Sequence, residues 1–160
     1  MFLTVTLNPA LDKTLCVDRN TPQDTLRATR SLDIAGGKGV NVARALHALG
    51  GRARALMPLA GHPGAHAADL ARAEGLEVAA VPVSGQTRTA ITIRVADTEQ
   101  YWHYLEPGPD LQESDLARVR EGFRRALEGC HTVALCGSLP SPSAAPLLPW
   151  MARTAANAGL

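Results

Sequence analysis

The sequence predicts an α/β fold in which helices cover a parallel sheet and a small antiparallel β lid lies over one edge of it. The main observation is an alternation. β-Prone stretches at 2–7, 53–60 and 77–83 are separated by stretches with helical spacing, which is typical of a parallel sheet. A second observation is the period-2 pattern at 87–95, which indicates a strand with only one buried face. With 160 residues and 46% hydrophobic content, the chain is long enough for one domain with its own core.

Composition argues against several classes of partner. The formal net charge is +1 and only 4% of residues are aromatic, so neither a basic groove nor a stacking platform for nucleic acid is expected. No apolar run approaches the roughly 20 residues that span a bilayer, and residues 1–11 lack a basic leader segment, so no membrane partner and a cytoplasmic location are expected. Cys16, Cys130 and Cys136 are odd in number and lack Cys-x-x-Cys spacing, which disfavours disulfides and a metal site.

The first strand leads to a candidate ligand-binding acid. Residues 2–7 form a buried strand that ends at Asn8-Pro9, and Asp12 follows within a few residues. In an open α/β sheet the ligand crevice lies beyond the carboxyl ends of the strands, where an acid accepts hydrogen bonds from a hydroxylated ligand. The spacing fits a turn-forming aspartate equally well.

A glycine-rich turn at 35–43, with the sequence AGGKGVNVA, opens the first helix. Glycine has no Cβ to hold a ligand away, and the first turn of a helix presents N–H groups without internal partners. Lys38 adds a positive charge, so the turn suits an anion, although an ordinary turn with a helix cap has the same glycines. The predicted apolar stripe of this helix, which ends at Gly50-Gly51, consists of Val42, Leu46 and Leu49.

Two other phosphate-binding loops fit this turn poorly. A nucleotide P-loop requires Ser or Thr directly after its lysine, and Gly39 follows Lys38 here. The dinucleotide fingerprint Gly-x-Gly-x-x-Gly matches at Gly37 and Gly39 but places Val42 at its third glycine. A dinucleotide-binding domain is therefore a weak alternative.

Four short stretches interrupt the parallel pattern. They have alternating or β-prone character and predict an antiparallel lid over the crevice or a surface for a second copy of the chain. These lid strands are expected near 14–18, 25–34, 87–95 and 100–105.

The later part of the chain continues the alternation. A helix at 65–74 precedes the third core strand, and a helical stripe that ends at Gly129 precedes a core strand at 132–136. Ser138 follows this strand at the same sheet edge as Asp12; it lies outside any Gly-x-Ser-x-Gly elbow, so a phosphate or hydroxyl contact is favoured over a nucleophile. The last predicted helix, 142–157, is normally followed by another strand. We therefore expect the sequence to be the first part of a longer protein.

Four motifs together resemble the ribokinase superfamily, and most closely its phosphofructokinase-B branch of 1-phosphofructokinases and tagatose-6-phosphate kinases. They are TLNPALD at 6–12, GGKGVNVAR at 36–44, Thr87-Arg88, and GSLP at 137–140. The resemblance covers the whole chain. It implies that residues 1–160 form the amino-terminal part of one three-layer ribokinase-like α/β domain with a β lid, and that the protein forms a homodimer through this lid.

The resemblance also implies a reaction and a binding site. ATP and Mg²⁺ would serve in phosphoryl transfer to a sugar phosphate. The first candidate reaction converts fructose 1-phosphate to fructose 1,6-bisphosphate, and fructose 6-phosphate and tagatose 6-phosphate are alternative acceptors. Asp12 would hold the sugar hydroxyls. Gly37, Lys38 and Asn41 would line the sugar-phosphate side of the crevice. Arg88 and Ser138 would bind the phosphate already on the substrate, a combination that suits a phosphate ester.

One family element is missing from these residues. Members of the family carry their catalytic aspartate in a Gly-Ala-Gly-Asp motif, and no Gly-x-Gly-Asp occurs here, so that aspartate is expected beyond Leu160. Phosphoryl transfer depends on positioning and on charge stabilisation around the γ-phosphate. The sequence therefore predicts a sugar-phosphate-binding half that is inactive alone. The alternative is a noncatalytic sugar-phosphate binding or interaction module.

Overall fold

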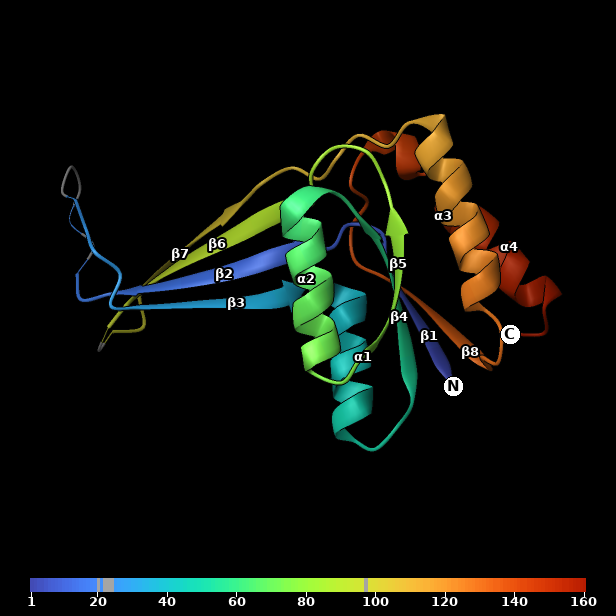
Figure 1. Cartoon of the computed structure of the whole chain (residues 1–160), viewed down its shortest axis with the longest axis horizontal. Coiled ribbons are helices and arrows are strands. Elements are labelled where there is room, and N and C mark those ends of the chain that lie inside the picture. Colours follow the sequence, from blue (N-terminus) through green and yellow to red (C-terminus); the bar gives the residue numbers. More distant parts are fainter. Residues whose placement is uncertain (20, 22–24, 97) are drawn as a thin grey trace.

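Two four-stranded sheets organise the chain (Figure 1). The computed structural model describes residues 1–19, 21, 25–96 and 98–160. The parallel sheet has the strand order β5-β4-β1-β8 and comprises β1 (Phe2–Thr6), β4 (Ala53–Leu59), β5 (Glu77–Pro82) and β8 (Thr132–Cys136). The second sheet has the order β3-β2-β6-β7 and comprises β2 (Ala10–Val17), β3 (Arg30–Gly36), β6 (Arg88–Val95) and β7 (Tyr101–Leu105).

Helices cover both faces of the parallel sheet, which confirms the predicted α/β fold. α1 and α2 lie on one face and α3 and α4 on the other (Figure 1). Their bounds are α1 Lys38–Ala48, α2 Gly61–Ala73, α3 Glu113–Ala126 and α4 Leu147–Asn157, with a short 3₁₀ helix, η1, at Pro142–Ala144. β1 lies between β4 and β8, and Leu3, Thr4 and Val5 are buried within it. A strand covered on both faces has no solvated side, so successive residues of β1 are buried, including Thr4 and Thr6.

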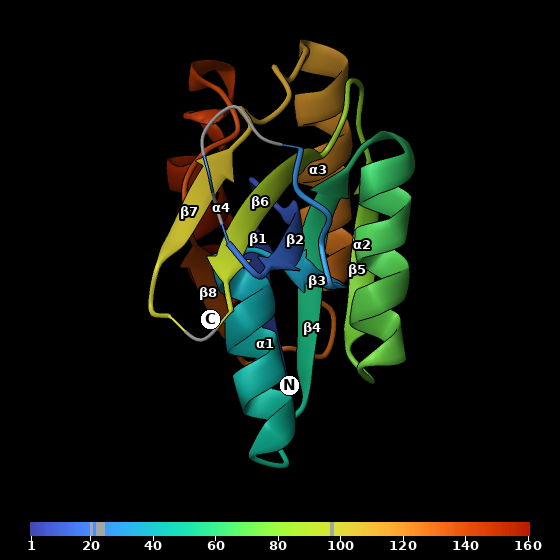
Figure 2. The same cartoon turned by 90° about the vertical axis from the view of Figure 1, so that its left-hand side faces the viewer.

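The lid is a mixed sheet, so the prediction of an antiparallel lid was wrong. β2 pairs with β3 in antiparallel fashion, and β6 pairs likewise with β7, but β2 and β6 run parallel to each other. This second sheet projects from the helix-covered body of the molecule (Figure 1). In the view from the free end of the second sheet, it lies in front of the parallel sheet (Figure 2). The parallel pairing joins strands far apart in the sequence. A side-chain alternation reports only which face is buried, so it cannot give strand direction.

The buried face of α1 also differs from the predicted stripe. Val42 and Leu49 have 37% and 85% of their surface exposed, and the buried residues are Gly39, Val40 and Ala43. A Cβ on Gly39 would lie 2.5 Å from Thr6 Oγ1 and 2.9 Å from the Val5 carbonyl oxygen. The helix therefore packs on β1 through its smallest residues, because the close approach of the two backbones determines which face is buried.

Two helix boundaries differ from the predicted ones, and a proline lies near each of them. α2 begins at Gly61 instead of residue 65, because Pro63 falls in the first turn, where a missing N–H removes no helical hydrogen bond. The predicted helix at 142–157 is divided into η1 and α4. Pro146 separates the two: Ala145 and Pro146 both keep helical backbone angles, but proline has no N–H to continue the helical hydrogen bonds.

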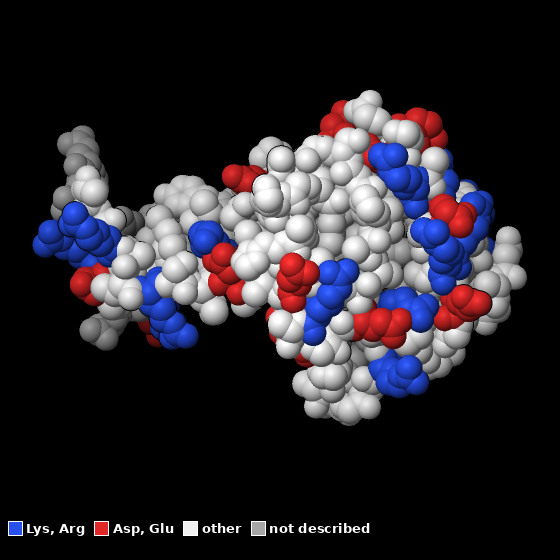
Figure 3. Space-filling view, viewed as in Figure 1, with Lys and Arg blue, Asp and Glu red and all other residues white. Residues whose placement is uncertain are grey.

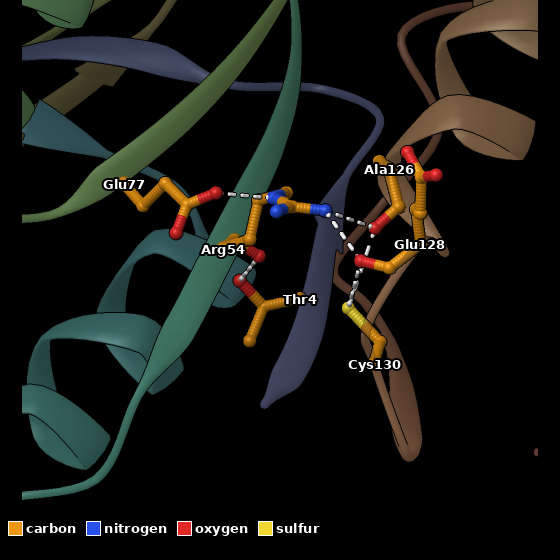
Figure 4. Close-up of polar contacts among 6 residues, drawn as sticks. All are labelled: Thr4, Arg54, Glu77, Ala126, Glu128 and Cys130. Carbon is orange, nitrogen blue, oxygen red and sulfur yellow. Dashed lines mark hydrogen bonds and ion pairs between the residues drawn. The ribbon is translucent and has the colours of Figure 1, made fainter.

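An arginine joins the layers near the amino ends of the parallel strands (Figure 4). Arg54 of β4 donates hydrogen bonds from Nη1 to the carbonyl oxygens of Ala126 (2.8 Å) and Glu128 (3.0 Å), and its Nε pairs with Glu77. Carbonyls at a helix C-terminus have no partner within the helix, and the macrodipole there favours a cation. Arg54, a residue of the parallel sheet, therefore supplies hydrogen-bond donors to carbonyl oxygens at the C-terminal end of α3.

Basic side chains gather over α3 on the face shown in Figure 3, where acidic side chains lie among them. Arg118, Arg120 and Arg124 form ion pairs with Asp115, Glu113 and Glu121 of the same helix. Within the described part of the chain, no helix has both the length and the apolar character needed to cross a membrane.

Candidate functional site

The candidate site lies where β1 and β8 end, at the N-terminus of α1 and the base of the lid. Gly37 precedes α1 with a φ of 125°, a conformation that favours glycine. A Cβ on Gly37 would lie 2.5 Å from Thr6 Cγ2. Thr6 Oγ1 accepts a hydrogen bond from the Val40 N–H at 3.1 Å and so supplies one partner for the first turn of α1. The glycine-rich turn is thus held against the end of β1.

Asp12 lies inside β2, opposite Ile34 of β3 and Ala90 of β6, and not in the turn that follows β1. Its carboxylate packs directly over Gly36, so that a Cβ there would overlap the carboxyl atoms. Burial raises the pKa of Asp12 from its ordinary value of 3.8, and the positive charges of Arg88, His103 and Arg44 partly oppose that rise. The cations thus favour the ionised form, which accepts hydrogen bonds from sugar hydroxyls.

Arg88 and Ser138 are joined through Asn8. Arg88 begins β6, and its Nη2 donates to the Asn8 carbonyl oxygen at 3.2 Å. The Asn8 Nδ2 donates to Ser138 Oγ at 3.2 Å and to the Leu139 carbonyl oxygen at 3.1 Å. Arg88 Nε is buried without a hydrogen-bond partner among the described residues. An unpaired buried guanidinium N–H carries a desolvation cost that an anionic ligand oxygen would relieve.

Lys38 and Asn41 lie on the first turns of α1 with exposed side chains. A Cβ on Gly137 would lie 3.4 Å from the Cβ and Cγ of Lys38, so the lysine stem passes beside the turn that carries Ser138. Asn41 Oδ1 accepts a hydrogen bond from Arg44 Nη1 at 2.6 Å. The structure therefore brings the predicted residues to one region, although Asn41 is engaged by a residue of its own helix.

Three neighbours of the site were not among its predicted residues. Asn8 connects Arg88 with Ser138, and its only sequence signal is its position before Pro9 at the end of a strand. Arg44 follows Asn41 by one helical turn, a spacing equally typical of a solvated helix face. His103 of β7 lies opposite Thr92, which in turn lies opposite Thr14, so His103 shares the lid face of Asp12.

Comparison with known proteins assigns the family. Residues 5–160 match the family model described as pfkB family carbohydrate kinase. The chain belongs to the pfkB family of carbohydrate kinases. This confirms the resemblance on which the site residues were predicted, and the pfkB match includes every one of them. Their individual roles in binding stay predictions.

Curated pfkB relatives include both kinds of phosphofructokinase. The chain is 34% identical over 144 residues to the ATP-dependent 6-phosphofructokinase isozyme 2 of Mycobacterium tuberculosis, which covers 90% of this chain and 42% of that protein. It is 36% identical over 140 residues to the 1-phosphofructokinase of Xanthomonas campestris, with 87% and 44% covered. The chain thus spans less than half the length of these curated relatives.

A solved structure shares the fold. Phosphofructokinase-2 from Escherichia coli in complex with fructose 6-phosphate superimposes with a TM-score of 0.86 at 31% sequence identity. The alignment covers 98% of this chain and 51% of that one. The same enzyme has been solved as a tetrameric inhibited form. The described part of the chain, a helix-covered parallel sheet with an attached lid sheet, therefore has the fold of this pfkB-type kinase.

The described residues fit a sugar phosphate better than a metal ion. Arginine, lysine, serine and an ionised aspartate suit phosphate and hydroxyl groups. Over residues 1–19, 21, 25–96 and 98–160, no group of three or more His, Cys, Asp and Glu side chains is arranged to hold a metal ion. ATP and Mg²⁺ are implied by the family. None of the candidate site residues named above is assigned to binding them.

Proposed function

We propose that the chain carries the acceptor-binding part of an ATP-dependent carbohydrate kinase and binds a ketohexose phosphate, with fructose 1-phosphate as the first candidate. The complete kinase would transfer the γ-phosphoryl group of ATP to a sugar hydroxyl and form fructose 1,6-bisphosphate. The observation that carries the proposal is the linked pair of Arg88 and Ser138 beside Asp12. Together they offer a guanidinium, a hydroxyl and a carboxylate to one ligand.

The residues divide between the two ends of such a ligand. Arg88, Ser138 and Lys38 would bind the phosphate, because charge-assisted hydrogen bonds from a guanidinium and an ammonium are strong for phosphate oxygens. Asp12 would accept hydrogen bonds from the hydroxyl groups. Gly37 would let the ligand approach the backbone N–H groups at the start of α1.

Fructose 6-phosphate is the second candidate acceptor. It is supported by the similarity to 6-phosphofructokinases from Mycobacterium tuberculosis and Escherichia coli, each 34% identical to this chain. Tagatose 6-phosphate is a third, on family resemblance alone. A few contacts separate such isomers, so competition among the three esters for one site is the measurement that ranks them.

The isolated chain is expected to bind without turnover. No Gly-x-Gly-Asp occurs in the sequence, so the carboxylate that would orient the attacking hydroxyl is absent from it. A coupled ADP-release assay with ATP, Mg²⁺ and fructose 1-phosphate should give no signal above background. Turnover near the roughly 1 to 100 per second of ordinary kinases would refute this expectation.

Arg88→Ala tests the binding site directly. We expect isothermal titration with fructose 1-phosphate to show binding by the wild-type chain and a loss of roughly tenfold to a hundredfold in affinity for the variant, as for hydrogen bonds to a charged group. Arg94→Ala, on the same strand toward the free end of the lid, serves as the control. Binding without turnover by a fusion of this chain to the carboxyl-terminal half of an active pfkB relative would favour the noncatalytic binding module. No heat from any of the three esters would refute the proposed function.

We also propose that the chain forms a homodimer through the lid. Of the five large hydrophobic side chains exposed on the described lid strands, four lie on one face and Tyr104 on the other, and such a cluster is unusual for a surface facing only solvent. By their register all four share the lid face of Asp12: Leu32, Ile34, Tyr101 and Leu105. The tetrameric form of the Escherichia coli relative supports an oligomeric assembly in the family.

A further inference from the structure

Arg44 gathers three partners around the start of α1. Its Nη1 donates to Asn41 Oδ1 at 2.6 Å, and its Nη2 donates to the Ala35 carbonyl oxygen at 2.9 Å and to Glu74 Oε1 at 3.0 Å. Its Nε pairs with the other carboxylate oxygen of Glu74. Two parallel N–H···O bonds to one carboxylate fix the plane of a guanidinium. Arg44 is therefore held by Glu74 and by the backbone, while one N–H is directed at Asn41.

This contact decides what Asn41 can offer to a ligand. A side-chain amide has one acceptor, its oxygen, and two N–H donors on its nitrogen. Because arginine has no acceptor, its contact with Asn41 engages the oxygen and leaves the Nδ2 hydrogens free. The exposed amide thus presents donors. Donors suit a phosphate oxygen, which only accepts.

Arg44 is also placed beside the rest of the site. Its Ala35 contact lies directly before Gly36, on which the Asp12 carboxylate packs. The positive charge of Arg44 acts on Asp12, because it is among the groups that oppose the rise in the Asp12 pKa. Asn41, Arg44 and Asp12 therefore belong to one neighbourhood.

We propose that Arg44 is a positioning residue that turns the Asn41 amide so that its N–H groups face a phosphate-ester oxygen of the ligand, with Glu74 holding Arg44 in place. This inference rests on the proposed function, since it assigns a donor role within the same site. It names a residue outside the predicted set. It also states which end of Asn41 meets the ligand.

Stability alone does not explain the Arg44 arrangement. The side chains of Arg44 and Glu74 have 33% and 32% of their surface exposed, and an ion pair near the surface contributes little to stability. Removing it should leave the fold intact. A binding defect in an Arg44 variant is therefore separable from unfolding.

The test is isothermal titration of fructose 1-phosphate into the chain and its variants. Arg44→Gln should weaken binding roughly tenfold, because a mobile amide no longer presents its donors reliably. Arg44→Lys should restore part of the affinity, since an ammonium still donates to Asn41 Oδ1. The matched control is Arg72→Gln on α2, which removes an arginine in an i,i+3 pair with Asp69 and should bind as the wild type does.

Variants of Asn41 test the direction of the amide. Asn41→Asp should bind more weakly than Asn41→Ala, because a carboxylate in place of donors repels a phosphate. Equal or better binding by Asn41→Asp overturns the donor assignment. Wild-type affinity in Arg44→Gln overturns the positioning role.

A ligand-free measurement separates this inference from the proposed function. The ¹⁵N relaxation of the Asn41 side-chain amide should report an ordered group in the wild type and a more mobile one in Arg44→Gln and Glu74→Gln. If no sugar phosphate binds to the wild type, the proposed function fails and the donor role fails with it. Equal amide mobility in the wild type and both variants overturns the positioning role whether or not a ligand binds.

Discussion

Gly36 and Asp12 are packed so closely that a methyl group at position 36 would occupy the place of the carboxylate. Gly36 is not among the glycines with positive φ, so the requirement is for space and not for an unusual backbone conformation. The same contact helps to bury Asp12, and burial raises the pKa of its carboxyl group. One glycine therefore sets both the position and the environment of the acid that would hold the sugar.

Gly36→Ala should displace Asp12 and weaken sugar-phosphate binding by more than tenfold, with a loss of roughly 1–3 kcal/mol in the free energy of unfolding from overpacking. Calorimetry and urea denaturation measure the two effects. Gly50→Ala is the matched control, because its Cβ meets nothing within 4 Å although its φ is 79°. Gly50→Ala should lower the free energy of unfolding through backbone strain alone and leave the affinity for the sugar phosphate unchanged. Unchanged binding in Gly36→Ala would contradict the role of this contact.

The first turn of α3 contains an acid that is entirely buried. Asp115 has 0% of its surface exposed and accepts hydrogen bonds from the N–H groups of Ser84 (2.9 Å) and Gln112 (3.0 Å) and from Arg118. Burial alone would raise its pKa, but these donors outweigh burial and hold the pKa below the ordinary value of 3.8. Asp115 thus joins the start of α3 to the segment that follows β5. At the other end of the helix, Arg54 satisfies its last carbonyls (Figure 4).

Asp115→Asn should lower the free energy of unfolding by roughly 1–3 kcal/mol at pH 7, because the amide lacks the charge and turns a donor toward other donors. Since the folded pKa is depressed, the contribution of Asp115 is fully present above the unfolded value and is lost as the pH falls through the folded pKa. The difference between wild type and variant should therefore shrink below about pH 3.8. Urea denaturation from pH 7 to pH 3 measures it.

Asp69→Asn is the control for Asp115→Asn, because Asp69 is 75% exposed in a similar i,i+3 pair with Arg72. It should change stability by less than about 0.5 kcal/mol at any pH. A pH-independent difference for Asp115→Asn would contradict the ionised state assigned to this acid.

The second sheet projects from the body of the molecule (Figure 1). Apolar side chains on one of its faces are exposed. α2 covers part of its opposite face, where His66 approaches Asp33 at 3.4 Å. The uncovered face carries Leu32 and Ile34 beside Asp12 in register. A partner that covers this face would also enclose the candidate site, so assembly and ligand binding are expected to be coupled.

The double variant Leu32→Asp, Ile34→Asp should convert a wild-type dimer into a monomer in sedimentation velocity, because charges in the core of an apolar contact oppose association. Leu49→Asp is the control, since Leu49 is 85% exposed at the end of α1, outside the lid. It should leave the dimer intact. A wild-type chain that is monomeric at 100 μM would refute the lid-mediated dimer.

Local sequence patterns were sufficient to predict most of the elements that form the core. The predicted strand at 132–136 coincides with β8. Of the helical stripe predicted before Gly129, which comprised Leu116, Val119, Phe123 and Leu127, the first three are buried in α3. Both predictions depend only on local periodicity against one apolar face. The α1 stripe was wrong because Gly39 packs closer to β1 than any large side chain allows. Asp12 and Ser138 were located by their positions after strands, Gly37 and Lys38 by the glycine-rich turn, and Arg88 by the family resemblance. Asn8 and Arg44 gave no signal of comparable strength.

Residue order alone specified the alternating strands and helices, the turns at Gly37 and Gly137, and the placement of Asp12 and Ser138 near one edge, because these depend on local spacing and on where parallel strands end. Arg88 was assigned to the site by the family resemblance of its motif. Tertiary structure decided the parallel pairing of β2 with β6, the link from Arg88 through Asn8 to Ser138, and the contact of Arg44 with Glu74. Most of these contacts join residues far apart in the chain. Their partners are chosen by packing, which no local pattern records.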